Sequence, residues 1–309
     1  MKTLLLIDAN SIIHRSFHAL PPFTAPGGDP SGAVYGVASI LLKLWREERP
    51  DYAVALFDRP EPTFREKKYA EYKAQRPPAP NELISQLIET HNLFSAFGIK
   101  TFEEPGYEAD DLIATCAEKF RGIKDLKVVI LTGDRDTLQL VHDPDIAVRT
   151  FKKGVSETMT YDEAAVREKY GLEPNQLIDY KALVGDPSDN IKGVPGVGPK
   201  TATEWLQRFG ALDNLYDNLE KDEKIKKRLG PFRKEAELSR ELVILDRAAP
   251  IRASDIEELK ITSGDNNDGV IMDYFKKMGF ETLLKRLGNS SEPTVEKKKR
   301  PKSRQTSIF

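Results

Sequence analysis

Three stretches of the chain are almost continuously apolar, and each ends in an aspartate. They are residues Thr3 to Asp8, Tyr52 to Asp58 and Val128 to Asp134. Continuous rather than alternating hydrophobicity is typical of parallel strands that are buried on both faces of a sheet. We therefore expect three buried parallel strands with an aspartate at the carboxyl end of each.

Helix-like segments lie between these strands, over 32–48 and 108–120. This alternation of strands and helices predicts an α/β fold with a mostly parallel central sheet and flanking helices. Ligands in such sheets bind at the carboxyl ends of the strands, where the three aspartates are expected. One aspartate there can be a helix cap or turn residue, but three on separate strands are harder to explain in that way.

A second, mostly helical region begins near Gly171 and finishes with an amphipathic stretch over 274–287. We therefore predict an α/β domain over 1–170 and a helical domain over 171–288. The residues that follow, 289–309, are polar and basic and cannot form a core, so we expect them to be disordered.

The composition is that of a soluble globular protein, with 39% hydrophobic and 31% charged residues among 309. No apolar run approaches the roughly 20 residues that span a bilayer, and the opening run is too short for a secretory signal. The single cysteine, Cys116, excludes an internal disulfide and a cysteine-based zinc site, and its apolar neighbours predict a core position. We expect a cytoplasmic protein without a membrane partner.

Acidic residues form clusters at the ends of apolar segments or in turns. The members are Asp8, Asp58, Glu108, Asp110, Asp111, Asp134, Asp136, Asp186 and Asp189. Hard divalent ions such as Mg²⁺ prefer oxygen ligands, and two ions about 4 Å apart stabilise attacking and leaving oxygens in phosphoryl chemistry. Without these nine acids, the net charge would change from -2 to +7, so the rest of the chain is basic enough to hold phosphates.

Each cluster taken alone is equally well explained as surface acids, and Asp110 or Asp111 can simply stabilise a helix N-terminus. If the clusters lie together at one edge of the sheet, the explanation as separate surface acids becomes less favourable. Two carboxylates about 4 Å apart repel by roughly 4 kcal/mol at an effective dielectric of about 20. Bound cations are then needed to hold them together.

These residues and their neighbours resemble the 5′ nuclease domain of bacterial DNA polymerase I and the related flap endonucleases. The resemblance covers about the first 290 residues and rests on LLLIDANSIIHRSFHAL, VALFDRPEPTFREKKYAEYKAQRPPAP, GYEADDLIATCA, ILTGDRDTLQLV and LVGDPSDNIKGVPGVGPKTATEWL. It implies a resolvase-like or PIN-like sheet domain. It also implies two Mg²⁺ ions, replaceable by Mn²⁺, with the first five acids nearer one ion and the last four nearer the other.

The segment over 63–76 interleaves basic and aromatic residues, which suits a single strand of nucleic acid. From the sequence alone, a solvated helix with an apolar face explains it slightly better. The resemblance instead implies an arch near 60–97 that receives the 5′ strand. It assigns DNA contacts to Arg65, Lys67 and Lys68 and stacking to Tyr72. It assigns contacts to the scissile phosphate to Lys73 and Arg76, and another catalytic phosphate contact to Arg15.

The glycine-rich stretch GVPGVGPK provides the backbone freedom of a turn between helices and places Pro199 at a favoured first helical position. The following helix N-terminus offers N–H groups to a phosphate. The resemblance implies a helix-hairpin-helix type motif near 175–209 that grips duplex DNA, with K⁺ at its turn. The implied contact residues are Gly193, Gly196, Gly198, Lys200 and Thr201.

The last residues, QTSIF, resemble the peptide with which bacterial proteins bind the sliding clamp, through Gln305, Ile308 and Phe309. The leading hypothesis is a free-standing 5′-3′ exonuclease and flap endonuclease, because no polymerase region follows and an excised domain has no reason to end in such a peptide. Its expected partner is branched or nicked duplex DNA with a 5′ single strand. The alternatives are an RNA-cleaving nuclease and a non-catalytic DNA-structure binder.

Overall fold

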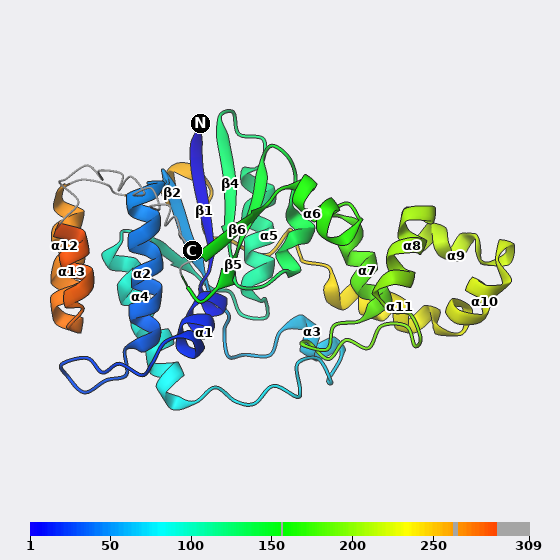
Figure 1. Cartoon of the computed structure of the whole chain (residues 1–309), viewed down its shortest axis with the longest axis horizontal. Coiled ribbons are helices and arrows are strands. Elements are labelled where there is room, and N and C mark those ends of the chain that lie inside the picture. Colours follow the sequence, from blue (N-terminus) through cyan, green and yellow to red (C-terminus); the bar gives the residue numbers. More distant parts are fainter. Residues whose placement is uncertain (156, 262–264, 289–309) are drawn as a thin grey trace, which may run out of the picture.

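A computed structural model of the chain describes residues 1–155, 157–261 and 265–288. Figure 1 shows a sheet with helices on both faces and a helical lobe that extends away from it. None of the helices in these ranges combines the length and the apolar character that crossing a bilayer requires.

The sheet has six strands in the order β3-β2-β1-β4-β5-β6. Their bounds are Lys2–Asp8 (β1), Tyr52–Leu56 (β2), Lys100–Phe102 (β3), Leu126–Leu131 (β4), Ile146–Lys153 (β5) and Glu157–Tyr161 (β6). All neighbouring pairs are parallel except β5 and β6. The predicted mostly parallel sheet and its three central strands are confirmed, whereas β3, β5 and β6 were not predicted.

Helices cover both faces of the sheet, and the third helix and the last two lie outside these layers (Figure 1). Their bounds are Ala9–Ala19 (α1), Gly32–Glu47 (α2), Phe64–Lys68 (α3), Asn81–Ala96 (α4), Ala109–Phe120 (α5), Glu163–Tyr170 (α6), Asp265–Met278 (α12) and Glu281–Gly288 (α13). Side chains of β1 alternate between the layers: Leu4 and Leu6 pack with α5, whereas Leu5 and Ile7 pack with α1, α2 and α4. The two helices expected between the strands therefore form as predicted.

The lobe consists of short helices. Their bounds are Gln176–Val184 (α7), Pro199–Phe209 (α8), Leu212–Asp217 (α9), Glu223–Leu229 (α10) and Arg233–Val243 (α11). Short 3₁₀ helices lie at Asp136–Leu140 (η1), Leu219–Lys221 (η2), Gly230–Phe232 (η3) and Ile256–Leu259 (η4). A turn joins α7 to α8 as the hairpin prediction requires, with Pro199 at the start of α8.

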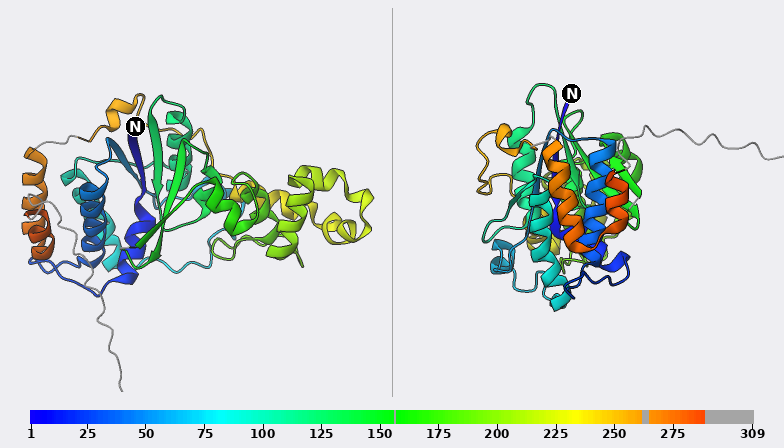
Figure 2. Two further views of the ribbon diagram at one scale, coloured as in Figure 1. Left: turned by 45° about the horizontal axis from the view of Figure 1, so that its top comes forward. Right: turned by 90° about the vertical axis from the view of Figure 1, so that its left-hand side faces the viewer.

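The predicted helical domain over 171–288 is divided in space. Ile271 and Phe275 of α12 are fully buried with residues of α2 and α4, so the last two helices cover the α/β domain rather than the lobe. Figure 2 shows α12 and α13 lying over these helices, at the opposite end of the molecule from α10. The expected single amphipathic stretch is broken at Gly279, whose φ of +72° ends α12.

The predicted arch over 60–97 is also shorter than expected. Its second half is α4, which buries Leu83, Leu93 and Phe94 in the core and therefore belongs to a helical layer. The first half consists of α3, which Thr63 and Glu66 start with a capping box, and a series of turns over 69–76. Only the part before α4 is placed to form an arch.

Candidate active site

The ends of β1, β2 and β4 position the first acidic side chains. Asp8 caps α1 by accepting a hydrogen bond of 3.0 Å from the Ser11 N–H, and its other oxygen accepts one of 2.6 Å from the Thr132 hydroxyl beyond β4. Asp58 accepts a hydrogen bond of 2.7 Å from the Ala109 N–H at the start of α5. Neighbouring strand ends and a helix N-terminus thus orient these two carboxylates.

A cavity of about 230 Å³ gathers seven of the nine predicted acids. They are Asp8, Asp58, Glu108, Asp110, Asp134, Asp136 and Asp189. Lys73, Arg76, Asn10, Ser11, Ala109 and His14 complete its lining. Residues separated by up to 181 positions therefore share one concave site at the carboxyl edge of the sheet.

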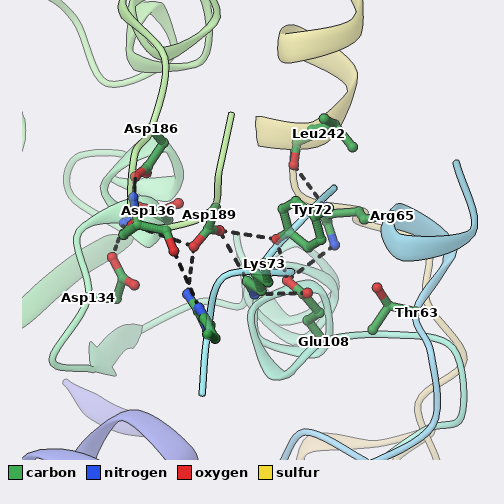
Figure 3. A network of polar contacts seen from close by, with 12 residues as sticks. Thr63, Arg65, Tyr72, Lys73, Glu108, Asp134, Asp136, Asp186, Asp189 and Leu242 are labelled. Atoms are coloured by element: carbon green, nitrogen blue, oxygen red, sulfur yellow. Dashed lines mark hydrogen bonds and ion pairs between the residues drawn. The ribbon is translucent and has the colours of Figure 1, made fainter. Parts of the chain in front are cut away.

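Basic and aromatic groups from the turns after α3 contact these acids (Figure 3). The Lys73 ammonium lies 2.9 Å from Glu108, and the Arg76 guanidinium lies 2.6 Å from Asp189. The Tyr72 hydroxyl donates to both acids, at 3.0 and 3.1 Å. Tyr72 is only 3% exposed in this arrangement, and its predicted stacking on a DNA base stays a prediction.

Two further predicted site residues, Arg65 and Asp111, form a buried ion pair. The Arg65 guanidinium donates to both oxygens of Asp111 at 2.6 and 2.7 Å, and both side chains are almost completely buried. Arg65 also donates to the carbonyl oxygens of Leu242 and Ile244. Arg65 is therefore buried in this arrangement, and Asp111 lies outside the lining of the acidic cavity. The roles predicted for them in DNA and metal binding stay predictions.

Lys181 of α7 is a site residue that the sequence analysis missed. Its ammonium contacts Asp136 and also lies 2.7 Å from Asp186, whose other oxygen accepts hydrogen bonds from Ser188. Asp186 consequently lies beside the cavity rather than in its lining. The feature of the sequence that could have identified Lys181 is its position near the end of a helix, shortly before the GDPSD cluster.

Two polar residues beside the strand ends were also missed. Thr132 fixes Asp8, and the Asn10 side-chain oxygen accepts a hydrogen bond of 3.1 Å from the Asp58 N–H. Both follow apolar strands directly, in LTGD and IDAN, so their place in the sequence could have identified them.

Burial and mutual repulsion perturb the carboxylates. Burial, reinforced by the charges of Asp58 and Asp134, raises the pKa of Asp8 to about 7, despite the opposing hydrogen bond from Thr132. Burial and the charge of Asp134 likewise raise the pKa of Asp136 to about 7. Burial and the neighbouring acids raise the pKa of Asp110 well above its usual value. Nearby positive charge would therefore stabilise the ionised form of each of these carboxyl groups.

The donor set suits a hard divalent cation. It consists of carboxylate oxygens, and one oxygen of Asp110 is buried without any hydrogen-bond partner among the described residues. Across the same ranges, no group of three or more Asp, Glu, His or Cys side chains is close enough in its present positions to coordinate one metal ion. Lys73, Arg76 and Lys181 contact several of the oxygens instead, so a divalent ion that uses those oxygens has to displace them.

Hydrogen bonds connect the turn after α3 to the loop between α7 and α8. The Lys73 N–H donates to the Asp189 carbonyl oxygen at 3.0 Å, in a left-handed conformation with φ of +53°. The side-chain amides of Gln75 and Asn190 donate to Pro187 and Glu71 carbonyl oxygens across the same contact. The predicted arch and the predicted hairpin therefore meet at the acidic cavity.

The remaining predicted contacts surround this cavity. Arg15 lines an adjoining hollow of about 400 Å³ that shares Ser11 with the cavity, and it donates to the Gly154 carbonyl oxygen at 2.6 Å. Lys67 and Lys68 are exposed on α3, where Lys68 pairs with Glu241. The clamp-binding prediction falls on Gln305, Ile308 and Phe309, which lie outside the described residues.

The hairpin turn owes its shape to glycine. Gly193 has φ of +65°, and a β-carbon there would lie 2.3 Å from the Gly185 nitrogen. Gly196 also has a positive φ but faces open space, and Gly198 precedes α8 as its N-cap. Lys200 and Thr201 lie in the first turn of α8, with Lys200 exposed.

Two family models match the chain consecutively. The first describes a 5′-3′ exonuclease N-terminal resolvase-like domain and matches residues 3–171. The second describes a 5′-3′ exonuclease C-terminal SAM fold and matches residues 172–267. Together they cover the sheet, the cavity and the helical lobe.

Individual proteins agree with this assignment. A 5′-3′ exonuclease of Aquifex aeolicus is 40% identical over 287 residues, which are 93% of this chain and 96% of that protein. DNA polymerase I of Mycobacterium bovis is 47% identical over 220 residues, 71% of this chain, but the match spans only 24% of the polymerase.

The fold is shared with a T5 flap endonuclease solved with DNA and metal ions. That structure superposes with a TM-score of 0.62 at 21% identity, over 94% of this chain and 98% of the other. The family models and the relative of matching length lead to one conclusion: the chain belongs to the 5′-3′ exonuclease family.

Proposed function

We propose that the protein is a structure-specific 5′ nuclease that hydrolyses DNA phosphodiester bonds at 5′ flaps, nicks and 5′ ends. The observation that carries this proposal is the cavity in which seven acids meet Lys73 and Arg76 beside the hairpin turn. Its acids suit cation-assisted hydrolysis, and its two basic residues suit a phosphate. The family membership supports the same reaction class.

We assign two Mg²⁺ ions, replaceable by Mn²⁺, to the acids of this cavity. When bound, such ions activate water and stabilise charge on the phosphoryl oxygens. Asp8 and Asp110 are candidates for one ion, and Asp134 and Asp136 for the other. Asp58, Glu108 and Asp189 complete the acidic lining, and Asp186 acts from beside it.

Lys73 and Arg76 are proposed to hold the scissile phosphate. Arg76 is half exposed, so its guanidinium can leave Asp189 and pair with a phosphate instead. Lys73 lies deeper and keeps Glu108 oriented until the phosphate arrives. Addition of water across the phosphodiester then leaves a 5′-phosphate and a 3′-hydroxyl.

The hairpin and the surfaces around the cavity are proposed to hold duplex DNA. The N-terminus of α8, where Lys200 and Thr201 lie, offers N–H groups and a positive charge to phosphates, which supports a contact that does not read sequence. We further propose K⁺ at the hairpin turn, and sliding-clamp binding through Gln305, Ile308 and Phe309. Action in primer removal and repair in the bacterial cytoplasm, at the nucleoid, accords with relatives that are DNA polymerases I.

A labelled 5′-flap duplex and a matched single-stranded RNA, each incubated with Mg²⁺, Mn²⁺ or chelator, test the proposal. We expect cleavage of the flap with either metal and none with chelator. Arg76→Ala should slow cleavage while metal-induced stabilisation persists. Cleavage of the RNA alone would establish the RNA-cleaving alternative, and flap binding without cleavage would establish the non-catalytic one.

A further inference from the structure

A groove of about 610 Å³ lies between α8 and α10. These two helices belong to the part of the lobe farthest from the sheet (Figure 1). Residues Thr201, Glu204, Trp205 and Arg208 form its α8 wall. Residues Asp222, Lys224, Ile225, Lys227 and Arg228 form the opposite wall. It is separate from the acidic cavity, with which it shares no residue.

The groove is positively charged. Its four basic side chains face two acidic ones, and one of these acids, Asp222, already pairs with Arg208 at 3.0 Å. Lys224, Lys227 and Arg228 make no ion pair within the described part of the chain, and all three are exposed. Three cations therefore remain available to an anionic partner.

The length of the groove fits a nucleic-acid strand. Thr201, Trp205 and Arg208 follow one face of α8, and seven residues of helix correspond to about 10 Å. Phosphates of one DNA strand rise by about 3.4 Å per nucleotide along the duplex axis, so a wall of this length can contact more than one successive phosphate. Thr201 belongs both to the groove and to the hairpin contact, so the two surfaces are continuous.

We propose that the α8–α10 groove is a second phosphate-binding surface, which holds the duplex arm of the substrate beyond the hairpin turn. This inference rests on the proposed nuclease function. Trp205 is 9% exposed and offers little surface to an apolar ligand, so the contact is electrostatic and independent of sequence. Its energy adds to substrate affinity and leaves the chemical step unchanged.

Binding of flap substrates as a function of salt and duplex length tests this inference. All proteins carry Asp110→Asn so that the strand remains intact, and the duplex arm is lengthened one base pair at a time. The test variant is Lys227→Ala with Arg228→Ala. The matched control is Lys285→Ala, which removes an exposed cation from α13 at the other end of the molecule.

With long arms, the slope of log affinity against log salt should decrease by about 1 for each groove cation removed, whereas the control should match the parent. With arms too short to pass the hairpin, test and control should coincide. Equal slopes for test and control at every length would overturn the inference and leave the groove to another partner, such as an acidic protein segment.

A failure of this inference can be told apart from a failure of the proposed function, because the protein with native acids is assayed in parallel for flap binding and cleavage. If that protein neither binds nor cuts flaps, the proposed function itself is wrong. If it does both and the groove variant matches the control, only the second phosphate-binding surface is refuted.

Discussion

Arg65 and Asp111 form a bidentate, almost fully buried ion pair that fastens α3 to the start of α5. Asp111 also accepts hydrogen bonds from the N–H groups of Glu108 and Asp246. The pair therefore positions Glu108 in the acidic cavity while it anchors the segment that carries Lys73 and Arg76.

Arg65→Met should lower the free energy of unfolding by about 3–5 kcal/mol, because it leaves the Asp111 carboxylate buried and unpaired. Urea denaturation measures the change. Lys68→Met is the matched control, since its ion pair with Glu241 is half exposed and worth less than about 1 kcal/mol. A loss no larger than that of the control would contradict the structural role of the pair.

Asp110→Asn should make the protein more stable in chelator and yet abolish flap cleavage. The neutral amide relieves the cost of burial and the repulsion from neighbouring acids, which together raise the pKa of Asp110, but it removes a negatively charged oxygen ligand. Thermal melting with chelator and a cleavage assay with Mg²⁺ measure the two effects. The exposed Asp29→Asn should change neither, and a destabilised Asp110→Asn would show that this carboxylate is not under electrostatic strain.

Lys181→Met should destabilise the protein by about 3 kcal/mol in chelator, because Asp136 and Asp186 lose their common partner. The same variant should gain more thermal stability from Mn²⁺ than the parent, because the ion no longer has to displace the Lys181 ammonium group from the carboxylates. Melting temperatures over a Mn²⁺ titration measure this gain. The exposed Lys192→Met should respond like the parent; an identical response of Lys181→Met would exclude competition between Lys181 and the metal.

Gly193→Ala and Gly196→Ala form a matched pair in the hairpin turn. Both have positive φ, which costs a non-glycine residue about 1–2 kcal/mol, but only Gly193 has no room for a β-carbon. Gly196→Ala should therefore cost about 1 kcal/mol and Gly193→Ala about 3 kcal/mol or more. Equal losses in urea denaturation would refute the close approach of Gly193 to Gly185.

Cys116 should resist alkylation in the folded protein at pH 8. It is fully buried, and burial raises its pKa to about 12, so the reactive thiolate is scarce. The thiol ionises at a lower pH in the unfolded chain than in the folded protein. Its ionisation therefore lowers the free energy of unfolding as the pH rises above 9. Mass spectrometry should detect rapid alkylation only in denaturing urea; rapid labelling of the native protein would contradict the buried position.

The sequence by itself determined the central strands, the acidic residues at their ends and the hairpin between helices. Each of these features has a local signal. Continuous hydrophobicity predicts β1, β2 and β4, and chain direction then places Asp8, Asp58 and Asp134 at one edge of the sheet. The glycine spacing after Asp189 predicts the turn, because only glycine adopts its backbone conformation at Gly193 without strain.

Only the tertiary structure decided which neighbouring side chains serve these features. Nothing in the sequence distinguishes Arg65, Tyr72 and Lys181 from the many other basic and aromatic residues. In the structure, each contacts acidic side chains that lie far from it along the chain or across a turn. The same holds for α12 and α13. Their amphipathic pattern predicts that one face of each helix is buried, but it does not identify the helices against which that face packs. The types of side chain and the spacing of apolar residues indicate which positions of one segment are buried or charged. The contact partners of those side chains depend on packing between segments that come together only on folding.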